Sequence, residues 1–293
     1  MANARALDKR RKSIRNIRKI TRTMELIATA RYKKAMERAQ AATAYTEQIT
    51  KIVGRLAASG LDVKHPLLEQ RDEVRNARVL VLTSNRGLCG GYNSSVLREA
   101  MPRIGELNQS VSNLSVDVSG KRGVDGLKFR GIVVDESHLN FEDQPAYDDV
   151  EKIADRYLSG YITGELDRLD VVYTKFVSTS KQVATIQTLL PLGSLGEADD
   201  ADTAGTNVQY EFLPSAESIL EEVVPTSFKV QLFKCFLDSA VSEQVARMVA
   251  MKGATENAGD MIKQLSMTYN RARQSQITGE IMEIIGGVEA LEG

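Results

Sequence analysis

The first stretch of the chain carries a single narrow apolar stripe. Apolar residues recur every three or four positions up to about residue 58, no proline precedes Pro66, and Gly54 is the only glycine before Gly60. This period predicts one helix roughly 80 Å long, with a seam as narrow as that of a coiled coil. The stripe consists of Ile17, Ile20, Met24, Ile27, Ala28, Ala35, Ala39, Ala42, Ile49, Val53 and Leu56.

The middle of the chain alternates between strand and helix patterns. A buried-type strand is predicted at 77–83, a glycine-rich turn follows it, and a helix is predicted over about 93–108. Further patterns predict strands at 113–120 and 128–135, a helix at 145–160, and an antiparallel strand pair at 169–179 and 181–192. This alternation predicts a central Rossmann-like α/β domain with a largely parallel sheet.

A second long helical pattern closes the chain. Pro225 stands where a helix can begin, and no proline interrupts the sequence from there to about Ile285. Two helices tethered through one domain most simply pair antiparallel. The fold class expected is therefore α/β, with a long antiparallel two-helix coiled coil formed by the N- and C-terminal helices. The expected parts are an N-terminal helix at 1–60, an α/β domain at 77–210, a short helix opened by Pro214 and Ser215, and a C-terminal coiled-coil segment at 214–290.

Composition and charge narrow the range of functions. The net charge of the 293 residues is -1, but residues 1–38 hold 13 Lys and Arg against 3 Asp and Glu. No aromatic residue is interleaved with the basic cluster from Lys9 to Arg22 to stack bases, so we expect no nucleic acid and infer an acidic protein partner. Two cysteines make no disulfide framework, two histidines exclude a histidine-rich metal site, and no apolar run is long enough to span a membrane.

The glycine-rich turn, "SNRGLCGGYN" at 84–93, leaves two interpretations open. A strand followed by glycines is typical of a phosphate-binding loop, and Cys89 between glycines is a candidate nucleophile. However, the segment lacks the Lys-Ser/Thr of a phosphate-binding loop and the full G-x-G-x-x-G spacing. The structural interpretation, in which glycines permit positive φ and close backbone approach, is favoured.

Several motifs along the chain resemble one family. "KSIRNIRKITRTMELIATARYKKA" (12–35) resembles the N-terminal helix of the gamma subunit of F-type ATP synthase of the bacterial type. "SEQVARMVAMKGATENAGDMI" (242–262) and "YNRARQSQITGEIMEIIGGVEAL" (269–291) resemble its C-terminal helix. The 84–93 loop resembles that family's glycine loop, although Asn85 stands where the family usually has Asp. The resemblance covers about residues 3–291.

The resemblance implies a central rotor shaft that couples ion flow through the membrane sector to ATP synthesis or hydrolysis on the β subunits and regulates ATPase activity. Such a shaft is not itself an enzyme, and we expect no catalytic residue, cofactor or metal. The implied partners are the α and β subunits of the catalytic head, the epsilon subunit and the c-subunit ring. No transit peptide is apparent, so we expect a peripheral protein at the cytoplasmic face of the bacterial inner membrane.

The resemblance also implies which residues contact the α/β head. Arg273, Gln274 and Thr278 lie within two turns of helix and match positions that contact a β-subunit loop in the family, and Arg247 matches another such position. Met24 matches a position near the same contact between the shaft and the α/β head. Arg31 stands where the family often has lysine, which keeps the charge but changes the geometry of a hydrogen bond.

Two functions of other classes remain as alternatives. The chain could be a nucleotide-binding or thiol enzyme that uses the 84–93 loop, or a free-standing coiled-coil adaptor that forms a rod-shaped homodimer. The first predicts nucleotide binding or Cys89-dependent activity by the isolated chain. The second predicts a stable dimer that needs no ATPase subunits.

Overall fold

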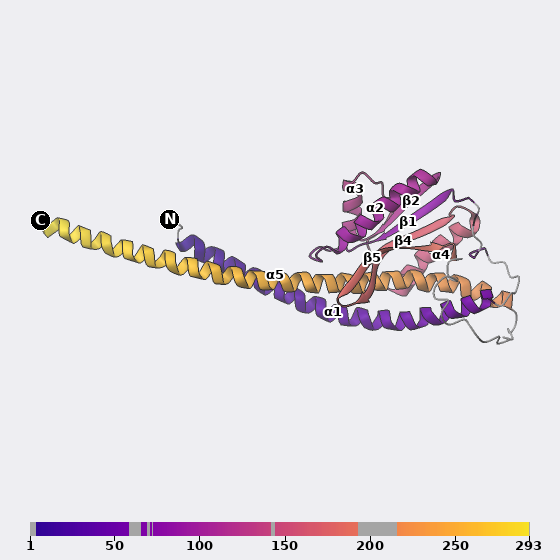
Figure 1. The fold of residues 1–293 in the computed structure, drawn as a ribbon, viewed down its shortest axis with the longest axis horizontal. Helices are drawn as coiled ribbons and strands as arrows, with labels where there is room; N and C mark the ends of the chain where they lie inside the picture. Colours follow the sequence, from indigo (N-terminus) through magenta and orange to yellow (C-terminus); the bar gives the residue numbers. More distant parts are fainter. Residues whose placement is uncertain are drawn as a thin grey trace. The chain divides into compact units, whose positions relative to one another are not determined.

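The fold consists of two very long helices with an α/β domain between them in the sequence. The computed structural model describes residues 4–58, 66–68, 71, 73–141, 144–192 and 216–292. The elements in chain order are α1 (Ala4–Ala58), β1 (Asn76–Leu82), α2 (Tyr92–Ser110), β2 (Asn113–Ser119), α3 (Lys121–Phe129), β3 (Glu136–His138), α4 (Tyr147–Thr163), β4 (Arg168–Ser178), β5 (Lys181–Leu190) and α5 (Ala216–Glu292). Figure 1 labels all of them except β3. The acidic sequence "EADDAD" at 197–202 and the helix start expected at Pro214 lie outside the described residues.

The chain divides into two compact units, which are described separately. The terminal-helix unit comprises Met1–Thr29 and Arg247–Gly293, and the α/β unit comprises Ala30–Ala246. Both long helices contribute to both units. The first turns of α1 and the later turns of α5 belong to the terminal-helix unit, and the remaining turns of both helices belong to the α/β unit.

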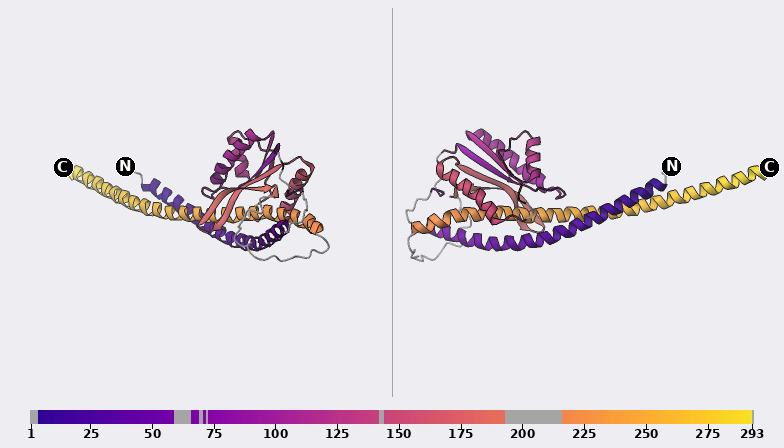
Figure 2. Two further views of the ribbon diagram at one scale, coloured as in Figure 1. Left: turned by 45° about the vertical axis from the view of Figure 1, so that its right-hand side comes forward. Right: turned by 180° about the vertical axis from the view of Figure 1, so that it is seen from behind.

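The sheet of the α/β unit follows the predicted α/β pattern. Its described strands have the order β3-β2-β1-β4-β5, of which only β5 runs antiparallel, next to β4. Helices α2 and α3 bury apolar residues against one face, including Val96 and Leu127. Helices α4 and α5 lie against the other face of the sheet, as the two ribbon views of Figure 2 show. They bury residues such as Tyr157 and Phe228 there. Strand order reverses between β1 and β4, so the glycine loop after β1 lies at a topological switch point.

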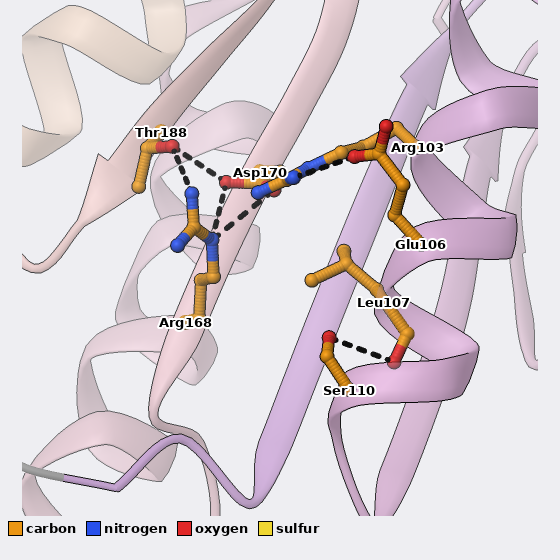
Figure 3. A network of polar contacts seen from close by, with 7 residues as sticks. All are labelled: Arg103, Glu106, Leu107, Ser110, Arg168, Asp170 and Thr188. Carbon is orange, nitrogen blue, oxygen red and sulfur yellow. Dashed lines mark hydrogen bonds and ion pairs between the residues drawn. The ribbon is translucent and has the colours of Figure 1, made fainter.

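A buried ionic network fixes α2 to the antiparallel edge of the sheet (Figure 3). Asp170 on β4 is fully buried and accepts a hydrogen bond from Arg103 Nε on α2 at 2.7 Å. Its other oxygen accepts from Thr188 Oγ1 on β5 at 2.7 Å, and Arg168 bridges Asp170 and Thr188. Because the buried charge is paired and hydrogen-bonded on several sides, the network sets register without leaving an unsatisfied carboxylate.

The helix pair in the α/β unit uses small residues at coiled-coil spacing. Ala35 and Ala39 of α1 are nearly fully buried against Leu237 and Val241 of α5. Lys234 Nζ of α5 donates to Thr43 Oγ1 of α1 at 3.2 Å. Successively higher numbers on one helix meet lower numbers on the other, so the predicted antiparallel pairing is confirmed in this unit.

Three sequence-based predictions need correction. The strand predicted at 128–135 is wrong: Lys128 and Phe129 end the unpredicted helix α3, and the third strand is β3, at Glu136–His138. Helix α3 was not predicted because it contains Gly123 and Gly126, and glycine is a poor helix former. Close packing requires Gly123, because a Cβ there would lie 2.5 Å from Thr83 Oγ1 and 2.7 Å from Val118 Cγ1. A Cβ on Gly126 would lie 2.5 Å from Leu97 Cδ1, so the end of the Leu97 side chain would have to shift.

The predicted start of the C-terminal helix at Pro225 is also wrong, because α5 begins at Ala216 and contains Pro225 in its interior. An interior proline costs about 3 kcal/mol in a helix. Val224 and Phe228 on either side are fully buried in the core, and their burial offsets that cost.

The third correction concerns the apolar stripe of α1. Ile17, Ile20 and Ile27, predicted as seam residues, are 45, 60 and 46% exposed. Among the α1 side chains that the structure describes, the buried positions have largely heptad spacing: Thr21, Ala28, Ala35, Ala39, Thr46 and Ile49. All of these except Ile49 are small or hydroxylated residues. Small side chains allow two helix backbones to approach closely, and this close approach turns the larger isoleucines outward.

Candidate partner-binding residues and the glycine loop

Polar groups of the glycine loop form hydrogen bonds with other groups of the same loop and with the start of α2. Ser84 N–H donates to Asn93 Oδ1 at 3.0 Å, and Ser84 Oγ donates to the Arg86 carbonyl at 2.7 Å. Leu88 and Gly90 adopt φ values of 66° and 57°, which form the tight turn into α2. Cys89 is 2% exposed and its sulfur accepts a hydrogen bond from Asn93 Nδ2 at 3.2 Å.

Asn85 joins three separate segments at this edge of the sheet. Its Nδ2 donates to the carbonyls of Leu139 at 3.1 Å and Phe141 at 2.6 Å, beyond β3. Its Oδ1 accepts the Lys121 N–H at 3.0 Å, at the start of α3. An aspartate, the residue expected from the family pattern, has no N–H to donate to the two carbonyls, so the asparagine suits this local arrangement.

The first turn of α3 has its N–H groups already bonded. Lys121 N–H binds Asn85, Arg122 N–H donates to the Ser84 carbonyl at 3.0 Å, and Gly123 N–H donates to Thr83 Oγ1 at 2.9 Å. A phosphate at a helix N-terminus needs such N–H groups as donors. Their internal use removes these donors from any phosphate at α3. The 84–93 loop itself leads into α2, where Tyr92 N–H donates to the Cys89 carbonyl at 3.2 Å.

In the terminal-helix unit, α1 and α5 again pair antiparallel. Thr255 Oγ1 donates to Thr21 Oγ1 at 2.9 Å, and the Arg11 guanidinium lies 4.6 Å from the centre of the Tyr269 ring. Ala28, Met251 and Ala258 are buried in this seam. The seam is therefore formed mainly by small and hydroxylated side chains, as in the α/β unit.

The structure places five of the six predicted partner-binding residues in the terminal-helix unit. Arg273, Gln274 and Thr278 are exposed on α5, Met24 is half-buried on α1, and Arg247 is only 8% exposed. Arg31 is half-buried and belongs to the α/β unit. Gln274 and Thr278 share a helix face by their spacing of four, and Arg273 lies beside Gln274.

Large apolar residues near the end of α5 are exposed. This exposed end of α5 has side chains 44–67% accessible at Ile277, Ile281, Met282, Ile284, Ile285 and Val288. Arg11 of α1 lies against Tyr269 of α5. Since α1 begins at Ala4, its N-terminal end lies about two turns beyond this contact in the direction of the C-terminus of α5. The described part of α1 therefore does not extend along this end.

One group of side chains among the described residues has the composition and spacing of a metal site. Asp117, Glu136 and His138 each offer a ligand atom within 4.8 Å of the others. Burial raises the pKa of Asp117 and lowers the pKa of His138, although the nearby Arg78 opposes the first shift and Glu136 opposes the second. The sequence reasoning missed this group because its members come from two strands that only the sheet register brings together.

The fold and these surfaces define a class: an α/β domain inserted between two long antiparallel helices, with an apolar helix end uncovered. The ATP synthase family model matches residues 3–291. An ATP synthase gamma chain of Rhodopirellula baltica is 80% identical over the whole of both chains, and one of Frankia casuarinae is 40% identical over 97% of this chain and 96% of that one. The chain belongs to the ATP synthase gamma chain family, which confirms the resemblance found in the sequence.

A solved structure agrees with the fold. A chain of the Euglena gracilis mitochondrial ATP synthase rotor superposes with a TM-score of 0.63, covering 94% of this chain and 98% of that one at 18% identity. At this identity the likeness concerns the fold alone. It confirms the combination of long terminal helices with a central mixed sheet.

Proposed function

We propose that this chain is the central rotor shaft of an F-type ATP synthase. As a non-catalytic subunit, it couples ion flow through the membrane sector to ATP synthesis or hydrolysis on the β subunits. Membership of the gamma chain family over essentially the full length supports this role. The α and β subunits, the epsilon subunit and the c-subunit ring are its partners.

The observation that carries the proposal is the exposed end of α5. Six large apolar side chains lie uncovered within twelve residues, from Ile277 to Val288. A single helix gains little stability from propensity alone in water, and apolar surface of this kind marks an interaction site. The catalytic head of α and β subunits is the partner that covers this end of the helix.

Polar residues beside the exposed end transmit the rotation. Arg273, Gln274 and Thr278 are exposed on α5, and we assign to them the contact with a β-subunit loop. A shaft shifts a conformational equilibrium only through contacts that differ in energy between the states. Exposed polar groups exchange partners at each step more readily than buried apolar ones do, because water solvates them in between.

The other three residues act from more covered positions. We assign contacts with the α/β head to Met24 and Arg31, which are both half-buried on α1. Arg247 is the least accessible of the six at 8% exposed, and we assign its contact with the head from the match to the family motif. These assignments rest on matches to the family motifs, with accessibility as supporting evidence.

The same proposal accounts for the organisation and location of the chain. Residues 1–60 and 214–290 form the coiled-coil shaft, and residues 77–210 form the globular domain that sits with the epsilon subunit on the c-ring. In the described part of the chain, no helix is long and apolar enough to cross a bilayer. The chain belongs to a membrane-associated complex, and we place it peripherally at the cytoplasmic face of the bacterial inner membrane.

Reconstitution tests this function against its alternatives. The purified chain is mixed with α and β subunits from the same organism, and complex size and ATP hydrolysis are measured. The shaft predicts one chain per head and steady ATP turnover, unchanged by Cys89→Ser. Nucleotide binding by the isolated chain, lost in Cys89→Ser, would support an enzyme that uses the glycine loop. A stable homodimer that ignores the head would support a free-standing adaptor.

A further inference from the structure

Three potential ligand side chains meet at the parallel edge of the sheet. Asp117 on β2 is the register partner of Glu136 on β3, and His138 lies two residues beyond Glu136 on the same side of that strand. Their ligand atoms lie within 4.8 Å of one another. Helix α4 covers this face and brings Arg156 and Tyr157 to the group.

Two of these side chains are buried with a polar atom left over. Asp117 is fully buried and His138 is 8% exposed. Among the described residues, Asp117 Oδ1 and His138 Nε2 have no hydrogen-bond partner. His138 Nδ1 lies 3.8 Å from Glu136 Oε1, so the imidazole already faces that carboxylate. An unsatisfied buried polar atom costs about 1–3 kcal/mol, so Asp117 Oδ1 and the second ring nitrogen of His138 indicate a bound ion or water that completes them.

Neighbouring residues hold the opposite sides of the carboxylates. Tyr157 Oη donates to Asp117 Oδ2 at 2.8 Å, and Arg78 reaches the same oxygen at 3.1 Å. Arg156 donates to Glu136 Oε1 at 2.6 Å. Outer hydrogen bonds of this kind fix the orientation of ligating carboxylates in known metal sites. Here they leave Asp117 Oδ1 for an inner ligand.

We propose that Asp117, Glu136 and His138 bind one divalent transition-metal ion of the Zn²⁺ type. One imidazole with two carboxylates suits Zn²⁺, and three protein ligands leave a fourth position for water. Mg²⁺ and Ca²⁺ prefer six or more oxygen ligands, which this group does not offer. The Glu136 side chain is 34% exposed, so an ion can reach the site from solvent.

The site would fasten the shortest strand of the sheet. β3 has three residues and lies at an edge of the sheet, where β2 is the only one of the described strands that pairs with it. A metal bound to Asp117 on one strand and to Glu136 and His138 on the other joins the two directly. Arg78 and Arg156 balance the charge of the two carboxylates when no ion is bound, so the fold does not depend on the metal. The positive charge of the two arginines also lowers the affinity of the site for a metal cation.

Zinc titration of the full-length chain tests the proposal. After treatment with a chelator, the chain is titrated with Zn²⁺ by calorimetry, and the bound ion is examined by X-ray absorption. We expect one equivalent, with nitrogen and oxygen ligands that include one imidazole, and no sulfur. His138→Gln should weaken binding at least about tenfold, because loss of outer contacts alone has that effect in known sites. His65→Gln, which removes the only other histidine, is the matched control and should bind as the unaltered chain does.

The opposite results would overturn the proposal. Absence of stoichiometric binding would mean that water fills the cluster, and binding kept in His138→Gln or sulfur in the spectrum would place the ion elsewhere. Circular dichroism checks that each variant is folded. If His138→Gln is not, Glu136→Gln at the half-exposed ligand gives the same test, and unchanged affinity in that variant would also contradict the site.

Discussion

Gly123 of α3 lies directly against Thr83 at the end of β1, and its N–H donates to Thr83 Oγ1 at 2.9 Å. A Cβ at Gly123 would lie 2.5 Å from that oxygen and 2.7 Å from Val118 Cγ1. This contact holds α3 against the sheet and completes the first turn of the helix.

We therefore predict that Gly123→Ala destabilises the chain by about 1–3 kcal/mol, the usual range for overpacking. Gly105→Ala is the matched control, because Gly105 is exposed in α2 and a Cβ there meets nothing within 4 Å. That change should stabilise by about 0.5–1 kcal/mol, since glycine is costly inside a helix. Urea unfolding of both variants measures the difference. Equal midpoints would show that α3 does not need its close approach to β1.

The small residues of the α1 seam give a second prediction. Ala39 is 5% exposed and belongs to the cluster with Leu237 and Val241. Ala39→Leu should force the helices apart and destabilise the chain by about 1–3 kcal/mol. Ala41→Leu, on the exposed side of the same helix, should change stability by less than about 0.5 kcal/mol. Thermal unfolding compares the pair, and a similar effect of both changes would contradict the observed seam.

A third prediction concerns Cys235 and alkaline pH. Burial, with a smaller effect from Asp238, raises the pKa of the Cys235 thiol from 9.0 to about 12. The folded state therefore retains a proton that the unfolded state loses, so this contribution to stability is complete below about pH 9 and is lost as the pH rises toward 12. In a Cys89→Ser chain, where Cys235 is the only thiol, alkylation at pH 8 should be slow until the chain unfolds.

Denaturant provides the control for that experiment. The same Cys89→Ser chain in guanidinium should react at the rate of a free thiol. Rapid alkylation without denaturant would mean that α5 is not packed against the sheet at Cys235.

A fourth prediction separates partner binding from folding. Arg273→Ala should leave the unfolding free energy of the isolated chain unchanged within about 0.5 kcal/mol, because the residue is exposed. Built into an α/β head, the same variant should lower ATP hydrolysis several-fold. Lys263→Ala on the same helix removes only an exposed ion pair with Asp260 and should leave both quantities unchanged. Equal ATP hydrolysis by the two variants would show that Arg273 does not form the proposed contact with the β subunit.

Much of the fold follows from local pattern in the sequence. The long helices, β1, β2 and the β4–β5 pair are periodic over enough residues for tertiary packing not to override them. Helix α3 could not be predicted, because Gly123 and Gly126 serve contacts with Thr83 and Leu97 that only the folded sheet creates. Proline at 225 is tolerated for a similar reason, since the burial of Val224 and Phe228 outweighs its local cost.

The sites differ in how far the sequence predicts them. Arg273, Gln274 and Thr278 were found through their motif, and their exposure on α5 is consistent with a role in partner binding. Asp117 and His138 lie on different strands, and no spacing in the sequence indicates that they meet. The outward position of Ile17 and Ile20 also depends on α5, because a stripe alone does not say which of its edges is covered.

Direct observation of rotation tests the central claim best. Phe129 is 90% exposed, so a Phe129→Cys chain can carry a bead there while the buried Cys89 and Cys235 remain unmodified. With the α and β subunits fixed to a surface, the shaft predicts stepwise rotation of the bead in one direction during ATP hydrolysis. A bead that stays still while the same complexes hydrolyse ATP at full rate would contradict the account.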